Sequence, residues 1–149
     1  TGCADPSLPP SVGAGLIVHD GGRVLVTERS DGHGWCFPGG DPEDGEGYLA
    51  AAAREAGEEV GFPPGSVDDA TLVGVYPAHG KGGAPSAAVV YAVQRPPGWV
   101  PDVIDPREVS GVRWVGREDR IGFAFGLEDA ARDWFGGRLL GGELAASRG

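Results

Sequence analysis

Carboxylates gather behind a glycine turn in the first half of the chain. From Gly39 to Phe62 the sequence reads GGDPEDGEGYLAAAAREAGEEVGF, in which Glu55, Glu58 and Glu59 are spaced i, i+3 and i+4. On a helix these three side chains share one face. Carboxylate oxygens are the ligands that hard divalent cations prefer, so the spacing makes this segment a candidate metal site.

The opposite side of this helix is expected to be small and apolar. The residues at core-facing spacing are Leu49, Ala52, Ala53, Ala56 and Val60. Such a helix can pack close to a sheet and direct its acids outward. Each pair of like charges at these spacings costs roughly 0.2–0.5 kcal/mol, which folding alone does not favour. A bound Mg²⁺ or Mn²⁺ would turn that repulsion into coordination, whereas the alternative is an ordinary solvated acidic face.

The rest of the chain supplies the elements that must position this segment. Patterning predicts strands at 12–19, 23–28, 71–76, 87–94 and 112–115, helices at 48–60 and 127–135, and loops at 30–34 and from Pro77 to Pro85. We divide the chain into a loose N-terminal arm (1–11), one domain (12–136) and a Gly- and Ala-rich tail (137–149). Strands mixed with two helices favour an α/β fold in which a mixed sheet lies between helices.

The segment from Gly40 to Phe62 resembles the signature of the Nudix hydrolase family, Gly-x5-Glu-x7-Arg-Glu-U-x-Glu-Glu-x-Gly-U, where U is a bulky aliphatic residue. Every fixed position matches, and the soft position is Ala56, where the family usually carries a larger aliphatic residue. The resemblance implies an α/β/α sandwich with a mixed sheet. It also implies Mg²⁺- or Mn²⁺-dependent hydrolysis of a diphosphate linkage in a nucleoside diphosphate joined to another group.

The resemblance assigns metal-binding roles to particular residues. Glu58 and Glu59 are the leading ligands, together with the backbone carbonyl of Gly39. Glu55 is either a further ligand or the base that activates water. Glu108, in the polar stretch DPREVSGVRWV, stands where several family members have a glutamate that binds metal or acts as base; the alternative is a solvated loop residue.

Two further motif residues have supporting roles. Arg54 is expected to orient a motif glutamate through a charge-assisted hydrogen bond, with substrate contact as the alternative. Glu46 is expected to be a structural partner near the glycine turn, with metal ligation as the alternative.

Substrate contacts are predicted outside the motif. Arg29 could bind a phosphate or form a surface ion pair. Trp35 and Phe37 could stack on a base or pack in the core. His79 and Lys81 could close over a polyphosphate or be solvated loop residues.

The composition of the chain limits the kinds of binding partner that we expect. With a net charge of −10 and a single lysine, the chain shows no basic stripe for extended nucleic-acid binding. Two cysteines do not make a disulfide framework, and Cys36 is expected to be a small buried hydrophobe. No apolar run reaches membrane-spanning length, so we expect a cytoplasmic protein that binds a small nucleotide and that could form a homodimer.

Three functional classes remain in view. The first is a hydrolase of ADP-ribose, a nucleotide sugar or a nucleoside triphosphate. The second is a Nudix domain that binds a ligand without catalysis, although such domains often lose motif glutamates that are all present here. The third is an acidic calcium-binding domain, which the absence of an alternating Asp/Asn loop disfavours.

Overall fold

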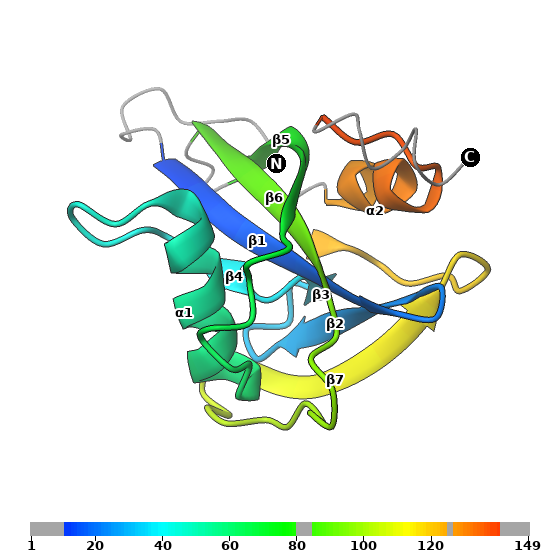
Figure 1. Cartoon of the computed structure of the whole chain (residues 1–149), viewed down its shortest axis with the longest axis horizontal. Coiled ribbons are helices and arrows are strands. Elements are labelled where there is room, and N and C mark those ends of the chain that lie inside the picture. Colours follow the sequence, from blue (N-terminus) through cyan, green and yellow to red (C-terminus); the bar gives the residue numbers. More distant parts are fainter. Residues whose placement is uncertain (1–10, 80–84, 125–126, 141–149) are drawn as a thin grey trace.

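The computed structural model describes residues 11–79, 85–124 and 127–140. Its strands lie in one sheet of order β3-β2-β1-β6-β5, with β4 paired to β1 and β7 paired to β2 (Figure 1). The strands are β1 Ser11–Asp20, β2 Arg23–Arg29, β3 Trp35–Cys36, β4 Gly39–Gly40, β5 Thr71–His79, β6 Pro85–Gln94 and β7 Val109–Gly116; the helices are α1 Tyr48–Val60 and α2 Glu128–Phe135.

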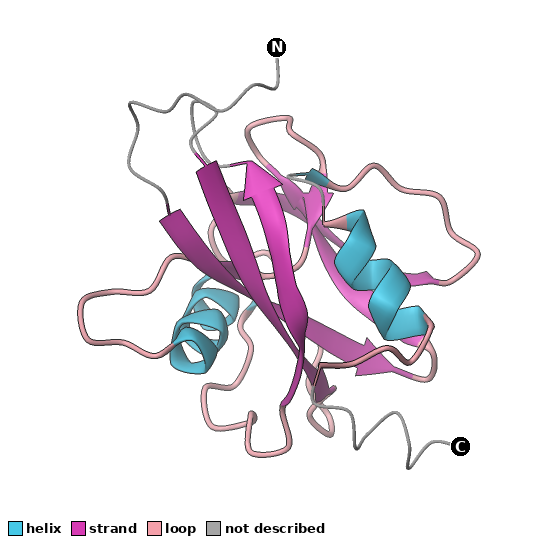
Figure 2. Ribbon diagram, turned by 90° about the horizontal axis from the view of Figure 1, so that it is seen from above, coloured by secondary structure: helices cyan, strands magenta, loops and turns pink. Residues whose placement is uncertain are grey.

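The sheet is mixed and has a helix on each face. Strands β1 and β6 pair in parallel, whereas the other pairings are antiparallel. Leu16 and Val18 pack in the cluster that contains α1, and Ile17 between them packs in the cluster that contains α2. Successive residues of a strand point to opposite faces, so both faces of β1 are buried. Figure 2 shows the two helices on opposite sides of the strands, which confirms the expected α/β/α sandwich.

Helix α1 has the bounds that the sequence predicts, Tyr48 to Val60. Gly47 precedes it in an extended conformation without a side-chain cap. Gly61 ends it with φ of 77°, the left-handed conformation that favours glycine. The buried residues of α1 are mostly alanines, and they allow its backbone to lie close to β1 and β4.

The predicted loop from Pro77 to Pro85 is wrong at both ends. Strand β5 continues to His79 and β6 begins at Pro85, with Pro77 opposite Ala87 in their antiparallel register. Proline is tolerated here because β5 lies at the edge of the sheet, where one side of the strand donates no ladder hydrogen bonds. Strand β7 is likewise longer than predicted, because it pairs with β2 from Val109 onward.

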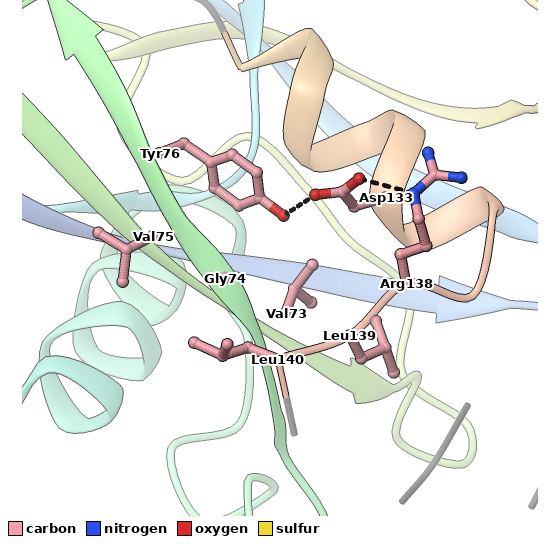
Figure 3. Close-up of a pocket in the computed structure, with 8 residues that line it drawn as sticks. All are labelled: Val73, Gly74, Val75, Tyr76, Asp133, Arg138, Leu139 and Leu140. Carbon is pink, nitrogen blue, oxygen red and sulfur yellow. Dashed lines mark hydrogen bonds and ion pairs between the residues drawn. The ribbon is translucent and has the colours of Figure 1, made fainter. Parts of the chain in front are cut away.

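The predicted tail is partly ordered against α2 and β5. Leu139 is buried, and the backbone N–H of Leu140 donates to the carbonyl oxygen of Val73 at 2.9 Å. In the hollow beside them, the Tyr76 hydroxyl donates to Asp133 of α2 at 2.7 Å (Figure 3). The segment just after α2 therefore belongs to the folded domain, while residues 141–149 lie outside the described part. Of the predicted arm, Ser11 begins β1, and the residues before it also lie outside the described part.

No helix in the described part of the chain is long and apolar enough to cross a membrane.

Candidate active site

The glycine turn is pressed between β1 and helix α1. A Cβ atom on Gly39 would overlap the backbone of Ala14, and one on Gly40 would approach the Glu55 carboxyl carbon to 2.6 Å. Only glycine allows both close approaches. The turn consequently places the backbone of Gly39 directly over the helix, where its N–H donates to a carboxylate oxygen of Glu59 at 3.2 Å.

The three helix glutamates differ in burial. The side chain of Glu58 is 58% exposed and that of Glu55 is 22% exposed, but Glu59 is only 8% exposed. The expectation that all three point outward is wrong for Glu59. The helical spacing places them on one face, but the glycine turn folds over one part of that face and covers Glu59.

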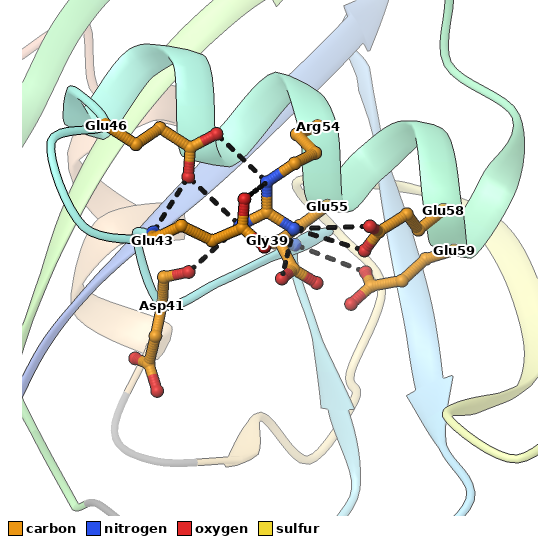
Figure 4. A network of polar contacts seen from close by, with 8 residues as sticks. All are labelled: Gly39, Asp41, Glu43, Glu46, Arg54, Glu55, Glu58 and Glu59. Carbon is orange, nitrogen blue, oxygen red and sulfur yellow. Dashed lines mark hydrogen bonds and ion pairs between the residues drawn. The ribbon is translucent and has the colours of Figure 1, made fainter.

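Arg54 joins most of the motif acids (Figure 4). Its guanidinium donates two hydrogen bonds to Glu46, at 2.9 and 3.0 Å, in a bidentate pair. The same group donates to Glu55 at 3.0 Å and to Glu58 at 3.3 Å, and it also donates to the carbonyl oxygen of Asp41. This bonding lowers the pKa of Glu46. The geometry suits the orienting role predicted for Arg54 and brings in the backbone of Asp41, which the sequence did not single out.

Burial and like charges raise the pKa of the two inner carboxylates, Glu55 and Glu59. Burial chiefly raises the pKa of Glu59 to about 8, and the charges of Glu55 and Glu108 add to this effect. The Gly39 N–H opposes it. The pKa of Glu55 is also raised, again chiefly by burial, with Glu58 and Glu108 contributing. Glu108 thus acts electrostatically on both helix glutamates, although it is far from them in the sequence.

These groups fit a hard divalent cation by their chemistry. They are oxygen donors with excess negative charge, which a cation would neutralise. Within the described residues, no three acidic, His or Cys side chains already converge on one ion position. Arg54 holds Glu55 and Glu58 in the present arrangement. Coordination therefore requires rotation of side chains, which is easiest for the exposed Glu58.

Three of the predicted substrate contacts, Arg29, Trp35 and Phe37, differ in how accessible their side chains are. Arg29 ends β2 beside the site, where its charge lowers the pKa of Glu59, but its guanidinium is bonded to Asp31 at 2.5–3.1 Å. Trp35 is half-buried on β3 and keeps an accessible part. Phe37 is 4% exposed and packs on Phe123 with ring centroids 5.4 Å apart, so it offers no open ring face.

The structure says little about the other two predicted substrate contacts, His79 and Lys81. Lys81 lies outside the described residues, and the backbone of His79 ends β5.

Burial raises the pKa of the Cys36 thiol, which is the opposite of what a nucleophilic cysteine needs.

The protein-family model of the NUDIX domain matches residues 9–134 of the sequence, and the chain belongs to the Nudix hydrolase family. Over 64 residues it is 39% identical to an RNA pyrophosphohydrolase of Aeromonas hydrophila, covering 43% of this chain and 34% of that protein. Over 113 residues it is 34% identical to the peroxisomal coenzyme A diphosphatase ndx-8 of Caenorhabditis elegans, covering 67% of this chain and 46% of that protein. The matched regions thus span less than half of either relative.

Among solved structures, the chain resembles a MutT NUDIX hydrolase from Burkholderia pseudomallei with a TM-score of 0.73 and 25% identity. The match covers 85% of this chain and 98% of that one. The similarity therefore extends over the whole sandwich and not only over the glutamate-bearing segment.

Proposed function

We propose that this chain is a divalent-metal-dependent hydrolase of a diphosphate linkage in a nucleoside diphosphate joined to another group. One observation carries the proposal. Glu55, Glu59 and Glu108 come from two distant parts of the chain, and the charge of Glu108 adds to burial in raising the pKa of both helix glutamates. Such an arrangement is costly for a protein without a bound cation, and it is suited to one that binds a cation.

The residues divide the chemical work. Glu58, Glu59 and the carbonyl oxygen of Gly39 are proposed to hold Mg²⁺ or Mn²⁺. Glu55 and Glu108 are proposed to act as a further ligand or as the base, and the two roles are not assigned between them. The cation, when bound, neutralises phosphate oxygens and lowers the pKa of a nearby water. The base takes a proton from the attacking water while the water oxygen bonds to phosphorus. The bridging P–O bond then breaks, and the other phosphate group leaves with the bridging oxygen. Arg54 is proposed to orient Glu46 through its bidentate pair and to hold the backbone of Asp41 beside the helix.

The substrate is proposed at the level of its class. The two relatives, an RNA pyrophosphohydrolase and a coenzyme A diphosphatase, are named for very different substrates, but both names denote cleavage of a diphosphate linkage. We therefore keep ADP-ribose, nucleotide sugars and nucleoside triphosphates as candidate substrates. A homodimer and a cytoplasmic location stay predictions from the sequence.

A substrate panel with Mg²⁺ or Mn²⁺, read by released phosphate and nucleoside monophosphate, tests the proposal. We expect turnover of at least one nucleotide of these classes and complete loss of turnover with EDTA. Binding of a nucleotide without turnover across the panel would instead support the alternative, a ligand-binding Nudix domain without catalysis.

The Arg29→Gln variant tests the proposed phosphate contact. Because a charge-assisted hydrogen bond contributes about 1.5–3 kcal/mol, we expect KM to rise roughly ten- to a hundred-fold with a much smaller change in kcat. Steady-state kinetics on the best substrate of the panel measure both. Arg23→Gln, an exposed arginine at the other end of β2, is the matched control. Equal KM values for the two variants would remove Arg29 from the substrate site.

A further inference from the structure

Glu108 stands at the end of a tight turn that the local sequence specifies. The N–H groups of Glu108 and Val109 both donate to the carbonyl oxygen of Asp105 at 3.1 Å. Asp105 and Pro106 occupy the first two turn positions, where these residue types are favoured. The turn sets the direction in which Glu108 leaves the backbone, but it does not by itself set the distance from Glu108 to helix α1.

On one side, the segment before this turn is fastened to the end of α1. The N–H of Asp102 donates to the carbonyl oxygen of Val60 at 3.2 Å, and the N–H of Ile104 donates to that of Glu59 at 3.0 Å. These bonds use helix-end carbonyls that have no partner within the helix. The backbone that leads to Glu108 is therefore tied to the backbone of the proposed metal ligand Glu59.

On the other side, one residue holds the turn against the end of β2. The hydroxyl of Ser30 donates to the carbonyl oxygen of Pro106 at 2.8 Å, and the N–H of Ser30 donates to that of Glu108 at 3.0 Å. Ser30 follows Arg29, the last residue of β2. It therefore bonds to the turn at two points, and the side-chain bond is the one that depends on its being serine.

We propose that Ser30 is a positioning residue that holds the Glu108 turn in register with the carboxylates of helix α1. This inference rests on the proposed function, since it assumes that Glu108 works in the hydrolytic site. Misplacement of a reacting group by about 1 Å can cost up to about a hundred-fold in rate. A lost hydroxyl bond, with the backbone bond retained, is a smaller perturbation of the same kind.

The Ser30→Ala variant should lower kcat roughly three- to ten-fold with little change in KM, because one hydrogen bond is lost away from the substrate. Ser30→Thr keeps a hydroxyl and should restore most of the activity. Ser110→Ala is the matched control, because the Ser110 hydroxyl lies beside the same turn but bonds to Glu28, at 3.3 and 3.4 Å. Its kinetics should equal those of the wild type.

A double-mutant cycle separates positioning from general loosening of the fold. If Ser30 acts through Glu108, then Ser30→Ala should lower kcat no further in a Glu108→Gln background. Mn²⁺ affinity, measured by electron paramagnetic resonance without substrate, gives a second readout. Ser30→Ala should weaken Mn²⁺ binding only if Glu108→Gln does so, and by less.

Each failure has its own pattern. A Glu108→Gln variant with reduced kcat beside a Ser30→Ala variant with wild-type kcat would overturn the inference and leave the proposed function intact. Additive losses in the double variant would also overturn it. A wild-type protein without turnover would count against the proposed function. The Mn²⁺ comparison would then decide the inference by itself. Mn²⁺ binding that is weakened in one of the two variants, Ser30→Ala or Glu108→Gln, and not in the other would overturn the inference.

Discussion

Replacing Glu58 by glutamine is expected to lower kcat by about two to four orders of magnitude while changing the free energy of unfolding by less than about 0.5 kcal/mol. The effect on catalysis follows from loss of a charged ligand. The small effect on stability follows from exposure, because 58% of the Glu58 side chain is exposed and its hydrogen bonds to Arg54 are long, at 3.3 Å.

Glu43→Gln is the matched control for this prediction. Glu43 is also an exposed acid near the Arg54 guanidinium, at 3.7 Å, but it lies in the loop before α1 and not on the helix face. Removing its charge should leave kcat within about two-fold, as expected for a surface change away from the site. Steady-state kinetics and urea unfolding of both variants measure the two effects. A Glu58→Gln variant that turns over at the wild-type rate would show that Glu58 does not bind the metal.

Replacing Glu59 by glutamine is expected to abolish activity and yet to stabilise the metal-free protein at pH 8. In the folded protein the pKa of Glu59 is raised to about 8 from an ordinary value of 4.5. Below about pH 4.5 both folded and unfolded states are protonated, and no penalty exists. Between 4.5 and 8 the unfolded state ionises more readily, so stability falls as the pH rises, and the loss levels off above 8. The full loss is on the order of a few kcal/mol.

Glutamine removes this ionisation while its amide oxygen can still accept the hydrogen bond from Gly39. In EDTA, the wild type should therefore lose thermal stability from pH 5 to pH 8, and Glu59→Gln should lose less. Added Mg²⁺ should raise the melting temperature of the wild type more than that of the variant, because a ligand stabilises the state that binds it. A variant that is less stable than the wild type at pH 8 in EDTA would contradict the assigned burial and charge of Glu59.

The sequence predicted the elements that have strong local signals. Helix α1 was placed with its observed bounds, because an alanine-rich face precedes a glycine that adopts the left-handed conformation at Gly61. The mixed sheet between two helices was also predicted correctly. Strand β5 was cut short, because proline and glycine after Tyr76 indicate a loop locally, whereas pairing with β6 depends on a distant segment.

The site was predicted less completely than the fold. Helical spacing places Glu55, Glu58 and Glu59 on one face, but no local pattern shows that the turn at Gly39 folds over Glu59. The burial of Phe37 has the same origin, because Phe123 covers it from a segment far along the chain. Ser30 gave no signal at all, since a serine in a polar loop is common and its partner Pro106 is distant in sequence.

Hydrolysis in ¹⁸O-labelled water, with Mg²⁺ and the best nucleotide of the panel, tests the central claim most directly. Metal-dependent attack of water on phosphorus predicts that one of the two phosphoryl products carries a single ¹⁸O atom by mass spectrometry, and that EDTA abolishes the labelled product. Product without label on a phosphoryl group, or labelled product formed equally in EDTA, would contradict the proposed metal-dependent cleavage of a diphosphate.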